Sequence, residues 1–127
     1  MQTEQFLATF KGKRYEHIWG YEVWIENNEI YCNKLLVLNK GYLSSWHYHE
    51  RKDETFIILK GSVGISSSQL DTDEITYQIL EPGDTFRIKP GLVHSFHSLS
   101  VKSIVMEVST TDDDDNVKLK PAREINY

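Results

Sequence analysis

The fold of this chain is decided by residues 41–61, which read GYLSSWHYHERKDETFIILKG. Glycines bound this stretch, and inside it His47 and His49 stand two positions apart. Alternate residues of a β-strand project from the same face of the sheet, so both imidazoles can reach one point in space. The stretch therefore predicts a β-strand that presents two ligands to one metal ion.

Two further residues complete a candidate ligand set. Glu54 follows His49 after the polar turn 50–53, and His94 lies forty residues beyond Glu54. Three imidazole nitrogens and one carboxylate oxygen are suitable ligands for one divalent transition metal, whether Fe, Mn, Zn, Ni or Co. A histidine pair in a strand is more often a surface feature or a hydrogen-bonded core group. The joint spacing of two glycines, two histidines and a glutamate favours the metal site.

Short apolar segments separated by turn signals fill most of the chain. We expect strands at 21–25, 30–38, 44–49, 55–60, 62–66, 75–80, 85–88, 94–99 and 102–109. Asn27-Asn28, Lys40-Gly41, Pro82-Gly83 and Pro90-Gly91 mark turns between them. No segment shows a helical period, and no internal repeat is present. The pattern predicts an all-β domain, an antiparallel sandwich or barrel.

Length and composition limit the class of protein. At 127 residues we expect one domain spanning 1–127. The net charge is −5 and no basic stripe is present, so we expect no nucleic-acid partner. No apolar run is long enough for a membrane helix, and no signal-peptide pattern is recognisable at the start of the chain. The single cysteine, Cys32, cannot form a disulfide within the chain, which fits a reducing cytoplasm.

Both ends differ in character from the central strands. Residues 1–20 read as an N-terminal arm whose apolar side chains, including Phe6, Phe10 and Trp19, pack on the chain's own barrel or on a second subunit. We expect a homodimer with this arm buried between the subunits. Residues 111–127 read as a C-terminal tail. Within it, Asp112–Asp115 could bind Ca²⁺ but lack the alternating spacing of an oxygen-ligand loop, so we expect a solvated acidic turn.

The residues of the metal motif carry a resemblance to a known family. The first cupin motif is matched without a gap by Gly41, His47, His49, Glu54 and Gly61. Residues 82–94 resemble the second motif, with Lys89 where the family usually has a proline and Ser98, just beyond, where an asparagine is common. The resemblance implies a double-stranded β-helix, the cupin jelly-roll barrel, with both histidines, the glutamate and His94 as metal ligands.

A narrower resemblance concerns activity. Residues 15–24 and 107–110 are similar to small cupins related to type II mannose-6-phosphate isomerases. Strand alternation puts Glu107 on the same face as Val105, which suits either a surface glutamate or a base in a cavity; the resemblance favours the catalytic base. Lys34 is a candidate for binding a sugar oxygen or phosphate. His17 and His97 are interpreted as ordinary histidines.

Three functions are compatible with this site. The first is an aldose–ketose isomerase acting on a small-molecule sugar or sugar phosphate, in which the metal polarises the carbonyl. The second is an Fe(II)-dependent dioxygenase, and the third is a sugar-binding cupin without turnover. Basic residues that could face a phosphate are few, which places the phosphate in doubt: Lys34, Lys60, Arg87 and Lys89. The ligand set is the same in all three cases, because one fold hosts many functions.

Overall fold

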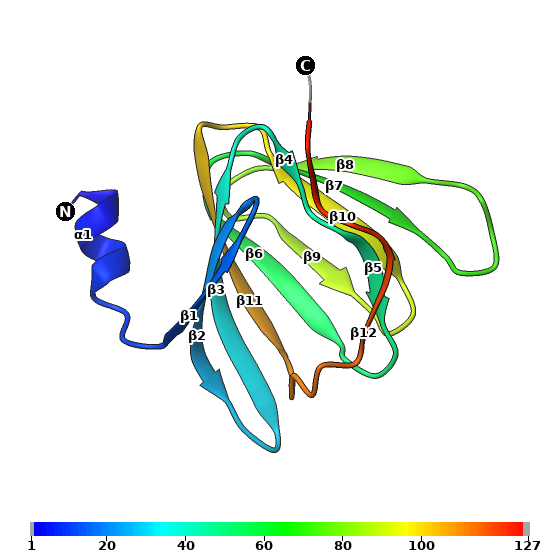
Figure 1. The fold of residues 1–127 in the computed structure, drawn as a ribbon, viewed down its shortest axis with the longest axis horizontal. Coiled ribbons are helices and arrows are strands. Elements are labelled where there is room, and N and C mark those ends of the chain that lie inside the picture. Colours follow the sequence, from blue (N-terminus) through cyan, green and yellow to red (C-terminus); the bar gives the residue numbers. More distant parts are fainter. Residues whose placement is uncertain (1, 126–127) are drawn as a thin grey trace.

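The computed structural model describes residues 2–125 and is built almost entirely from β-strands (Figure 1). One short helix precedes them, α1 (Thr3–Ala8). The strands are β1 (Lys13–His17), β2 (Gly20–Asn27), β3 (Tyr31–Asn39), β4 (Tyr42–Leu43), β5 (Trp46–His49), β6 (Glu54–Lys60), β7 (Val63–Ser68), β8 (Thr76–Leu80), β9 (Thr85–Ile88), β10 (Val93–Ser98), β11 (Lys102–Thr110), β12 (Asn116–Lys120) and β13 (Arg123–Glu124).

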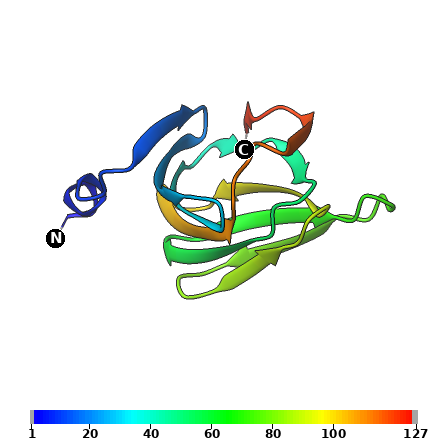
Figure 2. The ribbon, with the colours of Figure 1, turned by 90° about the horizontal axis from the view of Figure 1, so that it is seen from below.

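The strands form two sheets that face each other (Figure 2). One sheet has the order β1-β2-β3-β11-β6-β9, and the other the order β12-β5-β10-β4-β13, with β7 paired to β10 and β8 paired to β7. All pairings between these strands are antiparallel. Strands distant in sequence, such as β3 and β11, are neighbours. The arrangement confirms the expected all-β jelly roll of the cupin type.

Alternation along the strands sorts side chains between two apolar clusters. Leu36 and Leu38 of β3 point between the sheets and join Phe56, Ile58 and other buried residues there. The alternate residues of the same strand, Leu35 and Val37, point to the opposite face. The period of two in a strand explains this division. Four members of the inner cluster also line the cavity between the sheets: Trp19, Leu36, Phe56 and Phe96.

The N-terminal residues pack against their own chain. Leu7 of α1 is buried with Leu35 and Val37, and Phe10 packs at the edge of the same cluster. Trp19 is buried in the inner core, whereas Phe6 remains exposed. The sequence shows no helical period at α1, because this helix has only six residues.

Strand β1 lies in the N-terminal segment, where the sequence allowed an arm or a short strand but did not define its bounds, because KRYEH lacks apolar alternation. Gly20 permits the tight connection from β1 to β2: its φ is +146°, and a Cβ there would collide with the carbonyl oxygen of Val37. The C-terminal segment, expected as a tail, contains β12, which pairs with β5, and β13, which pairs with β4. Among residues 2–125, no helix is long and apolar enough to cross a membrane.

Candidate metal centre

Three histidines from two adjacent strands meet inside the barrel. His47 and His49 lie on β5, and His94 lies on β10 directly opposite His47 in the strand register. All three are buried, His94 completely. One nitrogen of each imidazole can be chosen so that the three atoms lie within 4.8 Å of one another. The structure thus brings together the three histidines that the sequence singled out.

Hydrogen bonds fix which ring nitrogen faces the cavity. Nδ1 of His47 donates to the Ser45 carbonyl oxygen at 2.9 Å, and Nδ1 of His94 donates to the Leu92 carbonyl oxygen at 2.9 Å. Nδ1 of His49 donates to Oδ1 of Asp115 at 3.1 Å. In a neutral imidazole a proton on Nδ1 leaves the lone pair on Nε2, so these hydrogen bonds make Nε2 the nitrogen of each ring that would bind a metal.

Glu54 faces the same point from β6. Its Oε2 lies 3.5 Å from Nε2 of His49, and its Oε1 lies 3.6 Å from Nε2 of His94. The Nε2 atom of His94 is buried and has no hydrogen-bond partner within residues 2–125. Burial, reinforced by the neighbouring His94, lowers the pKa of His47 to about 3, so its imidazole is neutral at physiological pH. Three imidazoles, one carboxylate and an unpaired buried nitrogen suit a divalent cation.

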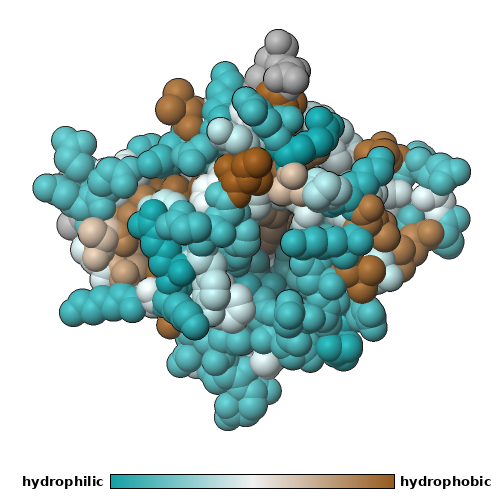
Figure 3. All heavy atoms as spheres, in the orientation of Figure 1, coloured by the Kyte–Doolittle hydropathy of each residue, from teal (hydrophilic) through white to brown (hydrophobic). Residues whose placement is uncertain are grey.

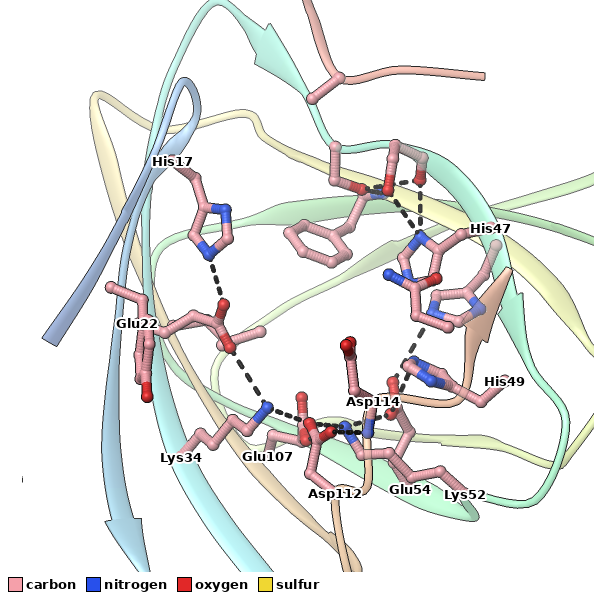
Figure 4. Close-up of a pocket in the computed structure, with 18 of the residues that line it drawn as sticks. His17, Glu22, Lys34, His47, His49, Lys52, Glu54, Glu107, Asp112 and Asp114 are labelled. Atoms are coloured by element: carbon pink, nitrogen blue, oxygen red, sulfur yellow. Dashed lines mark hydrogen bonds and ion pairs between the residues drawn. The ribbon is translucent and has the colours of Figure 1, made fainter. Parts of the chain in front are cut away.

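A buried lysine lies between the candidate metal ligands and a second carboxylate. The ammonium of Lys52 is 3.1 Å from Oε2 of Glu54, 2.6 Å from Oε2 of Glu107 and 3.3 Å from Oδ2 of Asp112. Lys52 stands two residues before Glu54, so both side chains project inward from the same face. In Figure 4 these groups meet at the bottom of the view. One ammonium group therefore neutralises only part of the charge of three carboxylates.

Because negative charge is in excess, the carboxyl groups of this cluster differ in pKa. Burial, joined by the charge of nearby Glu54, raises the pKa of Glu107 to about 7. Burial acts in the same direction on Glu54, but His94 and Lys52 outweigh it and hold the pKa of Glu54 well below its usual range. Burial alone would lower the pKa of Lys52, yet the surrounding carboxylates raise it. Of the two buried glutamates, Glu107 is therefore the one whose pKa is raised toward neutral pH.

A chain of ion pairs continues from this cluster to the other side of the cavity. Lys34, on β3 opposite Glu107, contacts Asp112 and lies 3.4 Å from Oε1 of Glu22. Glu22 in turn hydrogen-bonds His17, whose ring stacks on Trp19 at a centroid distance of 4.4 Å. Figure 4 shows His17 and His47 on opposite sides of the cavity. His17, interpreted from sequence as an ordinary histidine, therefore lines the site.

The acidic run Asp112–Asp115 is only partly the solvated turn that we expected: Asp113 and Asp114 are exposed, Asp112 is half-buried and Asp115 is buried. Asp115 is buried and accepts hydrogen bonds from His49 and from the backbone N–H groups of Arg51 and Lys52. Asp112 bridges the two buried lysines, and Asp114, with a φ of +60°, lines the cavity. Asp113 pairs with Arg51. The sequence did not predict these contacts, because the partner side chains lie about 60 to 80 positions away in sequence.

The site opens into a cavity of about 560 Å³. Figure 3 shows a hollow near the middle of this face, surrounded mostly by hydrophilic residues. Aromatic side chains form part of its wall: Tyr15, Trp19, Trp24, Phe56 and Phe96. A cavity of this size, with aromatic walls and many polar and charged groups, suits a small polar organic molecule. All six site residues predicted from the sequence line it: Lys34, His47, His49, Glu54, His94 and Glu107.

Comparison with known proteins identifies the family. The Cupin_2 family, described as a cupin domain, matches residues 34–110, more than half of the chain. The chain is a cupin. The matched range contains all four candidate ligands together with Lys34, Lys52 and Glu107, but neither His17 and Glu22 nor the acidic run. The four candidate metal ligands therefore lie within the family match, whereas some of the residues around them lie outside it.

One curated relative matches part of the cupin. This relative is germin-like protein 5-1 of Oryza sativa subsp. japonica, and it is 39% identical to this chain over 54 residues. The match covers 41% of this chain and 23% of the relative. The chain thus spans less than a quarter of that protein. This match supports the family and carries no assignment of activity.

Solved structures share the fold at low sequence identity. Capsular polysaccharide assembling protein CapF from Staphylococcus aureus superposes with a TM-score of 0.77 at 16% identity, over 85% of this chain and 34% of CapF. Oxalate decarboxylase from Bacillus subtilis gives 0.75 at 16% identity, over 86% of this chain and 30% of the decarboxylase. KdgF from Halomonas sp. gives 0.70 at 18% identity, over 83% of this chain and 91% of KdgF. At these identities the likeness shows the fold alone.

Proposed function

We propose that this cupin is a metal-dependent enzyme that converts a neutral sugar between its aldose and ketose forms. The observation that carries the proposal is Glu107, a buried carboxyl group with a pKa of about 7 that Lys52 connects to the candidate metal ligands. A base with a pKa near the working pH can both accept and return a proton efficiently. The sequence resemblance to isomerase-related cupins points to the same reaction.

Each residue of the site has a defined part in this proposal. His47, His49, His94 and Glu54 would hold one divalent metal, which when bound acts as a Lewis acid toward a carbonyl oxygen. Glu107 takes the proton as the C–H bond beside the carbonyl breaks, and returns it to the former carbonyl carbon. A hydroxyl proton passes between the two oxygens, so the atoms balance and no oxidant is needed.

The charges around the cavity favour a neutral substrate over a sugar phosphate. Both buried lysines are already in contact with carboxylates, Lys34 with Glu22 and Asp112, and Lys52 with three acidic groups. Neither is therefore free to bind a phosphate, whereas Asp114 adds negative charge to the cavity wall. Lys34 instead acts in this proposal by holding Glu22 and Asp112 in place. Aromatic walls and carboxylate acceptors suit the apolar faces and hydroxyl groups of a sugar.

The proposal is tested with a panel of neutral aldoses and ketoses, each beside its phosphorylated form, incubated with metal-loaded protein in D₂O under nitrogen. We expect conversion of a neutral sugar, with solvent deuterium incorporated at the carbon that receives the proton, as seen by NMR. Conversion only of phosphorylated sugars would overturn the neutral-substrate assignment. O₂ uptake stoichiometric with substrate loss would replace the isomerase by a dioxygenase, and binding without turnover would indicate a sugar-binding protein.

We also propose that the cupin is a homodimer. The N-terminal arm, residues 1–20, packs partly on its own chain and so does not form the whole interface. Leu7, Phe10 and Trp19 are covered by the chain itself, whereas Phe6 and Ile18 of the same arm are exposed, as are Ile75 and Ile79 beside and on β8. Figure 3 shows apolar side chains on the side where β8 lies. Light scattering at micromolar concentration should give twice the mass of one chain, and a monomeric mass would contradict the dimer.

A further inference from the structure

The carboxylate of Asp115 contacts His49 on the side of the ring opposite the nitrogen that would bind the metal. Its side chain has no exposed area, and its Oδ1 accepts the Nδ1 proton of His49 at 3.1 Å. Its Oδ2 accepts the backbone N–H groups of Arg51 at 2.6 Å and Lys52 at 3.0 Å. Burial would raise the pKa of Asp115, but these donors and His49 hold it below its usual value. The group is therefore a rigidly held carboxylate anion.

His49 differs in this respect from the other two histidines. His47 and His94 donate Nδ1–H to a neutral carbonyl oxygen only two residues earlier in the chain, at Ser45 and Leu92. His49 donates to a charged group 66 residues away. An anionic acceptor on Nδ1 fixes the tautomer and orientation of the ring and makes Nε2 a stronger base. Of the three imidazoles, His49 receives the strongest electrostatic support.

Asp115 also joins the site to the end of the chain. It directly precedes β12, which pairs with β5 in the register Asn116 with His49 and Val117 with Tyr48. Both Asp115 and β12 lie beyond residue 110, where the family match ends. The orientation of His49 thus depends on docking of a segment outside the cupin match.

We propose that Asp115 is a positioning residue that orients His49 toward the metal and couples metal binding to docking of β12. This inference rests on the proposed metal site. Carboxylate partners of this kind typically change metal affinity by about 10–100-fold. Coupling between two equilibria is reciprocal, so metal binding stabilises the docked form of β12 by the same factor. Amides of residues 116–120 should then exchange hydrogen more slowly when metal is bound.

The test compares three variants by titrating the metal-free full-length protein with Co²⁺, whose visible absorption reports its coordination. Asp115→Asn should weaken Co²⁺ binding by about 10–100-fold and alter the spectrum. Asp113→Asn changes the same acidic run at an exposed site paired only with Arg51, and should match the wild type. Val117→Ala loosens β12 without touching His49, and should retain the wild-type spectrum at saturation. Hydrogen exchange of 116–120 is measured with and without Co²⁺.

The outcomes separate the inference from the metal site itself. If the wild type binds Co²⁺ and Asp115→Asn binds it with equal affinity and an unchanged spectrum, the positioning role of Asp115 is wrong and the metal site stands. Equal losses of affinity in Asp115→Asn and Val117→Ala, with both spectra unchanged, would reduce Asp115 to a purely structural contact and overturn the inference. If the wild type binds no Co²⁺, both the metal site and the inference fall.

Discussion

Glu107→Gln should lower the turnover of the metal-loaded cupin by about 10²–10⁴-fold, the usual contribution of a general base. Glutamine keeps the size of the side chain and an oxygen that can contact Lys52, but it cannot take up a proton. Glu107 is not among the proposed ligands, so the metal content should not change. The measurement is the initial rate of deuterium incorporation into the sugar, paired with elemental analysis of the same sample.

The pH dependence of turnover is a second test of Glu107 as the base. Because the base must be ionised to accept the proton, and the pKa of Glu107 is raised to about 7, wild-type turnover should fall as the pH decreases through about 7. The glutamine variant should lose this limb of the profile. Glu29→Gln, in the exposed turn between β2 and β3, is the matched control and should retain full activity. Turnover within threefold of the wild type in Glu107→Gln would rule out Glu107 as the base.

Lys52→Met should destabilise the metal-free protein by about 3–5 kcal/mol, the usual result of removing one partner from a buried ion pair. Methionine occupies similar space but leaves Glu54, Glu107 and Asp112 facing one another without a cation. The free energy of unfolding is measured by urea denaturation at pH 8, where the carboxylates ionise.

The direction in which the lost stability changes with pH tests whether repulsion between the carboxylates causes the loss. Without Lys52 the carboxylates have raised pKa values in the folded state, so the lost stability should be greatest at pH 8 and should shrink as the pH falls and they take up protons. Lys11→Met, at an exposed lysine, should change stability by no more than about 0.5 kcal/mol. A loss below about 1 kcal/mol at pH 8, or one independent of pH, would show that Lys52 does not hold the cluster together.

The sequence predicted the parts of the site that follow from alternation within one strand. His47 and His49 share a face because they are two apart, and the same rule placed Glu107 with the buried Val105. Lys52 lies in the predicted turn 50–53, outside any strand, yet its side chain points inward like that of Glu54 two residues later. Strand parity, extended two residues before β6, could have found it.

Other parts of the site depend on pairings that one sequence does not reveal. Asp115 reaches His49 only because β12 docks on β5, and four consecutive aspartates normally indicate solvent exposure. His17 reaches the cavity through the hairpin of β1 and β2, whose first strand has no apolar alternation. In both places contacts distant in sequence override local composition, so the surroundings of the metal site were harder to predict than its ligands.

The metal content of the protein tests the central claim most directly. Wild-type protein stripped of metal, then dialysed separately against Mn²⁺, Fe²⁺, Co²⁺, Ni²⁺ and Zn²⁺, should retain one equivalent per chain of at least one ion by elemental analysis. The double variant His47→Ala/His49→Ala, treated in parallel, should retain none, because it lacks two of the four ligands. Equal metal content in the wild type and the double variant would contradict the assignment of these histidines as the metal site.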